Sequence, residues 1–253
     1  MNMTQTQVTR KTQPLHQPLG DGLTLRTPRD EGDITRCAAF VSVNMRETSG
    51  ITAERVLHHF PGLSLDDYLF VEDERTGEAV SNLCLIPWQF RFGEVTLDVA
   101  MLEIVATHPA YRRRGLIRTQ IGAFHNAVAQ QEFDFSIIEG IPYYYRQFGY
   151  GYAADHAAGD ALPRSRIPEL PPQVAPVQLR PATVDDIPHL VRLYDATYAA
   201  LDLSTVRTPA IWHYVLTAAE HPLYIIEQGT RIVGYVCAWR QPNGDVRIAE
   251  SGI

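Results

Sequence analysis

The sequence predicts an α/β protein built from two successive units. Three patterns support this fold class. An apolar strand at residues 102–107 leads through a glycine turn into an amphipathic helix. A hairpin pattern precedes this strand at residues 68–86. A similar order of strand, helix and hairpin begins again at Val177.

The strand at residues 102–107 consists largely of apolar and β-branched side chains. It ends before Pro109, because proline cannot extend a sheet. Beyond the turn, apolar residues recur at helical spacing from Leu116 to Val128, so a helix is expected just after Gly115. The turn therefore lies at a helix N-terminus.

The turn has the composition of an anion-binding site. Arg112, Arg113 and Arg114 are positively charged, and Gly115 leaves the backbone accessible. The first N–H groups of a helix lack intrahelical partners and lie at the positive end of the helix dipole, so a phosphate suits this position. The absence of G-K-[S/T], together with a single glycine, excludes a Walker loop and a dinucleotide fingerprint. A solvated basic turn is the alternative interpretation.

Two motifs resemble those of the Gcn5-related N-acetyltransferase (GNAT) family. Arg112, Gly115 and Ile117 occupy the fixed places of its Arg/Gln-x-x-Gly-x-Gly/Ala pyrophosphate loop, with Ile117 departing from the small third residue. After a strand pattern at residues 133–138, the segment that begins at Tyr145, Y-R-Q-F-G-Y-G, resembles the family's Y-x-x-x-G-[F/Y] segment. R-R-R-G followed by two aliphatic residues is similar to the tandem-domain subgroup typified by the enhanced-intracellular-survival acetyltransferases.

This resemblance implies a mixed, mostly antiparallel twisted sheet flanked by helices, the acyl-CoA N-acyltransferase fold, followed by a truncated second copy. The expected divisions are a flexible tail (1–20), a GNAT acetyltransferase domain (21–160), a Pro-rich linker (161–176) and a partial second GNAT-like domain (177–253). The sequence ends where a second cofactor loop would begin, so one active site is expected. The exposed edge of an incomplete sheet favours either a homo-oligomer or pairing across the two domains.

The resemblance also implies which residues bind the acyl donor. Backbone groups of the strand would contact the pantetheine arm, and the N–H groups of the turn would bind the pyrophosphate. Arginine side chains would reach the remaining phosphate. The expected cofactor-binding residues are Val105, Ala106, Thr107, Arg112, Arg113, Arg114, Gly115, Leu116, Ile117 and Arg118.

Two residues are expected to be catalytic. Tyr145 matches the family tyrosine that acts as general acid toward the coenzyme thiolate. Packing is the alternative role, and the adjacent Tyr143 and Tyr144 leave a shift of one position open. Glu103 lies before the pantetheine-binding segment, where a carboxylate accepts a proton directly or through water. An ion pair with an arginine is the equally weighted alternative for Glu103.

The remaining elements follow from periodicity and turn residues. Trp88, Phe90 and Phe92 alternate, which suits either an aromatic acceptor pocket or the sheet core. Strands are expected at 23–27, 68–71, 79–86, 95–107, 157–163, 223–227, 231–239 and 246–253, and helices at 34–43, at 51–60 and from Val184.

Composition excludes several functional classes. The chain has 253 residues and a formal net charge of −7, which argues against nucleic-acid or anionic-membrane binding through the whole surface. No apolar run approaches the roughly 20 residues of a membrane span, and no secretory signal is visible. Cys37, Cys84 and Cys237 suit neither a disulfide framework nor a metal site, so no metal and a cytoplasmic location are expected.

The implied function is an acetyl-CoA-dependent N-acetyltransferase that moves an acetyl group to a primary amine. Direct attack in a ternary complex is expected, because no cysteine lies in the loop to hold an acyl intermediate. The alternative is a non-catalytic acyl-CoA-binding or regulatory module. A weaker one is a nucleic-acid contact by R-R-R-G, which would require steeply salt-dependent binding. The sequence does not decide whether the acceptor is a small molecule or a peptide.

Overall fold

The computed structural model describes residues 13–253 except 46, 155–161, 168, 170–176 and 219. The chain divides into two compact units. The first contains the chain up to Gly140 together with Tyr198–Glu220, and the second contains Ile141–Thr197 together with His221–Ile253.

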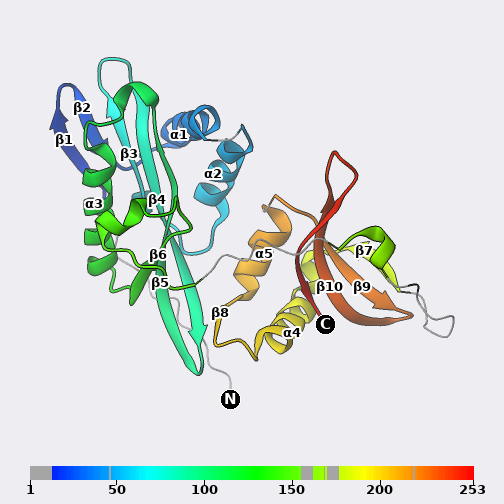
Figure 1. Ribbon diagram of the computed structural model, residues 1–253. Coiled ribbons are helices and arrows are strands. Elements are labelled where there is room, and N and C mark those ends of the chain that lie inside the picture. Colours follow the sequence, from blue (N-terminus) through cyan, green and yellow to red (C-terminus); the bar gives the residue numbers. More distant parts are fainter. Residues whose placement is uncertain (1–12, 46, 155–161, 168, 170–176, 219) are drawn as a thin grey trace. The chain divides into compact units, whose positions relative to one another are not determined.

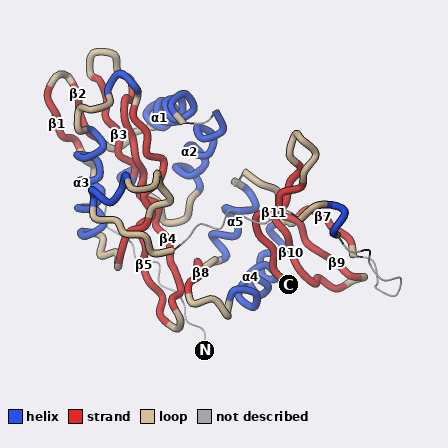
Figure 2. Tube along the Cα trace, viewed as in Figure 1, coloured by secondary structure: helices blue, strands red, loops and turns tan. Residues whose placement is uncertain are grey.

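The first unit is built on a seven-stranded sheet (Figures 1 and 2). Its strand order is β1-β2-β3-β4-β5-β6, and β8 pairs with β4. Among these described pairs, only β5 and β6 run parallel, which confirms a mixed, mostly antiparallel sheet. The strands are β1 (His16–Gly20), β2 (Leu23–Arg26), β3 (Tyr68–Asp73), β4 (Glu78–Phe92), β5 (Val95–Thr107), β6 (Phe135–Ile137) and β8 (Leu203–Thr205).

Helices cover both faces of this sheet. Helices α1 (Glu31–Asn44) and α2 (Glu47–His59) lie on one face, and α3 (Leu116–Gln130) lies on the other (Figure 1). Tyr68 and Phe70 of β3 belong to the core formed with α1 and α2. The expected inward residues of the second helix are buried in the same core: Ala53, Val56, Leu57 and Phe60.

Helix α1 begins at Glu31, slightly before the start expected at residue 34. The Asp30 side chain accepts a hydrogen bond from the Asp33 backbone N–H at 3.0 Å, so Asp30 is the N-cap. The Asp33 side chain then turns back toward the sheet and meets Arg26 on β2.

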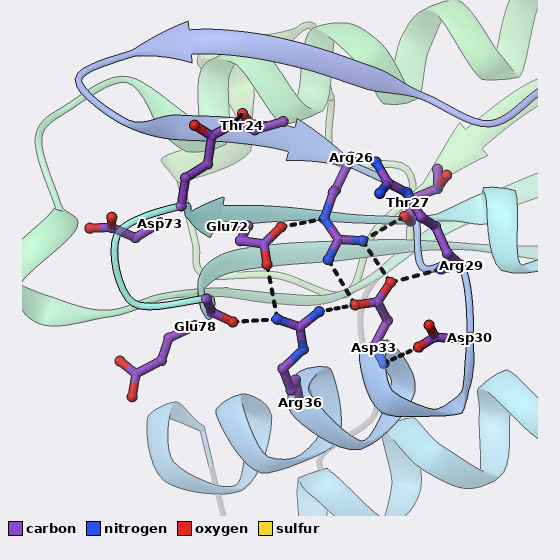
Figure 3. A network of polar contacts seen from close by, with 12 residues as sticks. Thr24, Arg26, Thr27, Arg29, Asp30, Asp33, Arg36, Glu72, Asp73 and Glu78 are labelled. Carbon is purple, nitrogen blue, oxygen red and sulfur yellow. Dashed lines mark hydrogen bonds and ion pairs between the residues drawn. The ribbon is translucent and has the colours of Figure 1, made fainter.

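Arg26 holds β2, β3 and α1 together (Figure 3). Its terminal nitrogens donate to both oxygens of Asp33 at 2.6 and 2.7 Å, and its Nε donates to Glu72 at 2.5 Å. Arg36 also bonds Asp33 and Glu72 from the next turn of α1. Only 5% of the Arg26 side chain and 3% of the Asp33 side chain are exposed, and this Arg26 contact holds the pKa of Asp33 well below its usual range.

The second unit contains a four-stranded antiparallel sheet of order β11-β10-β9-β7. It also contains most of α4, whose Leu190 and Tyr194 are buried. The elements are β7 (Gln178–Pro181), α4 (Ile187–Tyr198), β9 (Leu223–Gln228), β10 (Arg231–Arg240) and β11 (Val246–Gly252). The hairpin and last strand expected after residue 220 are confirmed.

The contacts of Arg26 with Asp33 and Glu72 form an arginine clamp, and a second arginine clamp occurs in the second unit. Arg180 donates to both oxygens of Asp186 at 2.7 and 2.8 Å, and through Nε to Glu227 at 2.9 Å. The strand register also recurs, because each arginine bonds the glutamate two residues beyond its own strand partner. The second clamp is more open, since 37% of the Arg180 side chain is exposed.

Three expectations about the elements need correction. Residues 16–20, expected within a flexible tail, form β1 because they pair with β2. The strand at 133–138 is shorter, since only Phe135–Ile137 pair with β5. The segment 198–220, assigned to the second domain, belongs to the first unit, where β8 pairs with β4.

Helix α5 (Pro209–Thr217) in that segment adds Ile211 to the first core. The expected strand at 157–163 falls largely outside the described residues, as does the linker from 170 to 176. No helix in the described part of the chain is long and apolar enough to span a bilayer.

Replacement of Arg26 by methionine should destabilise the first unit by about 3–5 kcal/mol, because Asp33 would remain buried without its partner. The matched change Arg180→Met should cost the second unit about 1 kcal/mol or less, since that pair is partly solvated. Hydrogen exchange of β2 and β3 amides, compared with β7 and β9 amides, measures the two effects separately.

The effect of Arg26→Met should depend on pH. Arg26 depresses the pKa of Asp33, so its contribution is complete above the unfolded value of about 4 and is lost as pH falls toward the folded value. Two results would contradict the assignment of Arg26 as a buried clamp. One is an equal loss of stability in the two units, and the other is a loss from Arg26→Met that does not become smaller as the pH falls.

Candidate functional site

The β5–α3 connection forms the turn that the sequence singled out. After β5, residues Pro109–Tyr111 make a short 3₁₀ turn, and Gly115 is the N-cap of α3 with φ +76°. Gly115 provides no side-chain cap, and the first helical bond at this end is Thr119 N–H to the Gly115 carbonyl. The N–H groups at the start of α3 are therefore free of helical partners and could donate hydrogen bonds to an anion.

The arginines of the turn lie on the surface. Arg112, Arg113 and Arg114 are all exposed, and Arg113 adopts φ +64°. The Arg114 guanidinium lies 4.8 Å from the ring centre of Tyr111, which fixes part of the turn without using its charge in an ion pair. The side chains thus present positive charge beside the helix N-terminus.

Tyr111 ties the turn to the sheet. Its hydroxyl donates to Asp73 Oδ2 at the end of β3, at 2.7 Å. Arg75 also binds Asp73, and these hydrogen bonds, that of Arg75 first, hold the pKa of Asp73 well below its usual range. This contact was not expected from the sequence, because Tyr111 and Asp73 lie 38 positions apart and carry no local motif.

The tip of the first hairpin lies beside the same helix terminus. Asp21 and Leu19 from the β1–β2 turn line a cavity of about 440 Å³ together with Arg114, Leu116 and Thr119. This neighbour was also missed, since residues 16–20 were expected to be a tail. The glycines that flank Asp21 were the available signal of a turn.

Helix α3 is fixed to the sheet by a buried polar chain. Gln120 donates through Nε2 to the Leu69 carbonyl at 3.1 Å and accepts from Ser81 at 2.5 Å. The Ser81 hydroxyl also lies 3.1 Å from the carbonyl oxygen of Ala106. The start of α3 and the end of β5 are therefore held in one geometry.

Strands β5 and β6 pair only over a short stretch. Val99–Met101 lie opposite Phe135–Ile137, and the pairing stops there. Beyond Met101, β5 has no ladder partner on that side among the described strands, although it continues to Thr107. The predicted pantetheine-binding residues Val105, Ala106 and Thr107 lie on this open edge.

A bulge interrupts β5 on its other side. Asn82 lies opposite Ala106 and Cys84 opposite Glu103, so Ile104 and Val105 together face Leu83. Ile104 adopts φ +55°, a rare conformation for a β-branched residue. The Ile104 carbonyl accepts a hydrogen bond from Asn82 Nδ2 at 2.6 Å.

Glu103 lies immediately before the bulge and is half-buried. Burial raises the pKa of its carboxyl group to about 7, and Glu139 beyond β6 adds to this rise. A hydrogen bond from the Ile104 N–H, at 3.4 Å, acts in the opposite direction. No ion pair between Glu103 and an arginine is recorded among the described residues, so the environment favours a proton acceptor active near neutral pH.

Tyr145 belongs to the second unit, whereas Glu103 belongs to the first. Tyr145 is half-buried in a 3₁₀ turn (Tyr144–Phe148). Its ring contacts include Tyr144 at 5.0 Å and Tyr150 at 6.1 Å between centres. The general-acid role of Tyr145 stays a prediction.

The structure therefore brings most predicted site residues onto one continuous segment of the first unit. Glu103 and the pantetheine-binding residues lie on β5, and the arginine turn follows directly. Trp88 instead packs edge-on against Phe60, with 5.0 Å between ring centres, while Phe92 is largely exposed. No group of three or more metal-ligating side chains occurs within the described ranges.

Comparisons with known proteins agree with this fold. Residues 28–153 match the family model described as an acetyltransferase (GNAT) domain. The crystal structure of Saccharomyces cerevisiae N-myristoyltransferase with bound myristoyl-CoA is similar at a TM-score of 0.67 and 13% identity, covering 96% of this chain and 68% of that chain. No curated protein matches the sequence.

A second similar structure comes from Enterococcus faecalis V583. It is a conserved protein of unknown function, a probable N-acyltransferase, with a TM-score of 0.64 and 16% identity; 91% of this chain and 58% of that chain are covered. The chain thus spans about two thirds or less of the length of these proteins. At these identities the similarity shows the fold alone. Residues 28–153 therefore carry a GNAT acetyltransferase domain, within an N-acyltransferase fold.

Proposed function

We propose that the protein is an acyl-CoA-dependent N-acyltransferase that moves an acetyl group to a primary amine. The observation that carries this proposal is Glu103, a half-buried carboxyl group with a pKa of about 7 on the open edge of β5. Few residues of a sheet combine partial burial, an open strand edge and a proton affinity suited to neutral pH.

The acyl donor fits the turn that follows β5. The exposed arginines and the α3 N-terminus offer charge and backbone donors to a pyrophosphate. A Cβ placed on Gly115 would meet no heavy atom within 4 Å, so the backbone at this point is open to a ligand. The pantetheine arm would then extend along the β5 edge at Val105, Ala106 and Thr107.

The reaction is proposed to be a direct transfer in a ternary complex. Glu103 accepts a proton from the ammonium form of the acceptor, directly or through water. The neutral amine attacks the thioester carbonyl, the new C–N bond forms, and the C–S bond breaks with departure of the coenzyme thiolate, while the nitrogen gives its second proton to solvent water. Tyr145 is the proposed donor of the proton that the thiolate takes up.

The second unit is proposed to be a partial copy of the first. The recurrence of the Arg–Asp–Glu clamp, with the same strand register, supports this relation. We further propose a single acyl-CoA site in the first unit and a homo-oligomer.

Glu103→Gln should lower kcat by about 10²–10⁴ while leaving acyl-CoA affinity unchanged, because the amide is isosteric but accepts no proton at neutral pH. Wild-type kcat/KM should fall as pH drops below 7, since Glu103 acts only when deprotonated. Rates of thiol release across pH, measured with an acceptor whose own pKa lies far from 7, test both expectations. A wild-type profile that is flat between pH 6 and 8 would remove Glu103 as the base.

Gly115→Ala should weaken acetyl-CoA binding about 5–30-fold, because alanine disfavours the left-handed conformation by roughly 1–2 kcal/mol. Gly122→Ala is the matched control. Gly122 lies inside α3, where an added Cβ also meets no atom within 4 Å but the backbone is helical. Calorimetric titration with acetyl-CoA should show weaker binding for Gly115→Ala only.

The variant Arg113→Ala/Arg118→Ala should weaken binding in the same titration through loss of positive charge near the phosphates. Titrations with octanoyl-CoA and myristoyl-CoA test the acyl length, because one similar structure contains myristoyl-CoA. If the folded wild-type chain binds none of these thioesters, the proposed function is wrong.

Tyr145→Phe should reduce turnover by at least about 10²-fold without weakening acyl-CoA binding, because only the hydroxyl proton is lost. Tyr144→Phe is the control at the neighbouring position and should keep its activity. Single-turnover rates with acetyl-CoA and an amine compare the two. Acyl-CoA binding without turnover of any amine by the wild type would instead favour a non-catalytic acyl-CoA-binding module.

A further inference from the structure

Asn82 is a fully buried polar residue of the sheet in the first unit. Its side chain is fully buried on β4, between strand neighbours Ser81 and Leu83. Its Nδ2 donates to two acceptors, the Tyr68 hydroxyl at 2.7 Å and the Ile104 carbonyl at 2.6 Å. Among the described residues, its Oδ1 has no hydrogen-bond partner.

The orientation of the Asn82 amide follows from the Ile104 carbonyl. A carbonyl only accepts hydrogen bonds, so the NH₂ group must face it, and Oδ1 is then left buried and unpaired. An unpaired buried oxygen is unfavourable. A leucine has the same branched skeleton and carries no oxygen to leave unpaired, so the asparagine has a use that packing alone does not explain.

That use is visible at Ile104. The residue is held at φ +55°, where a β-branched side chain is strained, and such strain persists only when neighbouring groups fix it. Asn82 binds the carbonyl of Ile104, and the N–H of Ile104 points to the carboxylate of Glu103. One strained residue therefore connects the buried amide to the proposed base.

We propose that Asn82 is a positioning residue that holds the bulge at Ile104 and thereby sets the orientation and proton affinity of Glu103. The inference rests on the proposed function only where it calls Glu103 the general base, since the geometric argument concerns the carboxyl group itself. If Asn82 released the Ile104 carbonyl, Ile104 would relax toward extended backbone and its N–H would leave Glu103.

The groups that surround Glu103 determine the direction of the effect. Glu139, beyond β6, and burial both raise the pKa of Glu103, whereas the Ile104 N–H lowers it. Cys84 faces Glu103 from β4, and its thiol pKa lies well above the usual range, so it stays neutral. Loss of the Ile104 hydrogen bond therefore leaves only the groups that raise the pKa.

The test is a ¹³C NMR titration of the Glu103 side-chain carboxyl in protein labelled at glutamate, assigned by Glu103→Gln and recorded without substrate. Asn82→Leu should move its inflection upward by about half to one pH unit, the scale of one weak hydrogen bond. Asn82→Ser, whose hydroxyl is too short to reach both acceptors, should give a smaller shift and serves if the leucine variant fails to fold.

Two further variants separate positioning from stability. Tyr68→Phe removes the other acceptor of Asn82 without touching Ile104, so it should leave the Glu103 inflection in place. Asn82→Leu/Ile104→Gly should shift it by less than half as much as Asn82→Leu, because glycine keeps φ +55° without strain. In kinetic assays, Asn82→Leu should lower kcat/KM at pH 7 and move its acid limb upward.

An unchanged Glu103 inflection in folded Asn82→Leu, or in folded Asn82→Ser where the leucine variant does not fold, overturns the inference. An equal shift in Tyr68→Phe also overturns it, because that result assigns the effect to general loosening. The carboxyl titration needs no turnover. A chain that acylates no amine but shows the expected shifts would therefore count against the proposed function and leave the role of Asn82 established.

Discussion

The pairing of β4 with β5 is the constraint on which the first unit depends. These two long strands pair over most of their length; β3, β6 and β8 pair directly with them, and β2 and then β1 follow beyond β3. One irregularity, the bulge opposite Leu83, breaks the ladder where β5 also loses β6 as a partner. Residues 103–107 therefore stay paired with β4 on one side of β5, apart from the bulge, and present an open strand edge on the other side.

The rest of the first unit keeps this edge in position. Ser81 and Gln120 tie α3 to the end of β5, and Tyr111 ties the arginine turn to Asp73 on β3. The N-terminal end of α3 and the carboxyl group of Glu103 are consequently both tied to the same sheet. The proposed site for a long thioester and a proton acceptor would benefit from these ties, since binding then costs little ordering of the protein.

The two arginine clamps have the same geometry but differ in how deeply they are buried. In each unit an arginine on the first strand of a repeated pattern bonds an aspartate at the start of a helix and a glutamate on the neighbouring strand. In the first unit the pair is enclosed under α1, whereas in the second the arginine is partly solvated. The same geometry therefore contributes different free energies, because desolvation and not distance decides the strength of an ion pair.

The sequence by itself determined the elements whose signals are local: the strand ended by Pro109, the glycine at the start of α3 and both hairpins. It also placed Glu103 and the arginine turn on one segment, because consecutive residues on a strand and helix cannot separate. Only the tertiary structure decided that β1 joins the sheet, that residues 198–220 return to the first unit, and that Asn82 meets Ile104. These depend on contacts between residues distant in sequence, and hydrophobic periodicity carries no information about which distant strand or carbonyl a side chain will face.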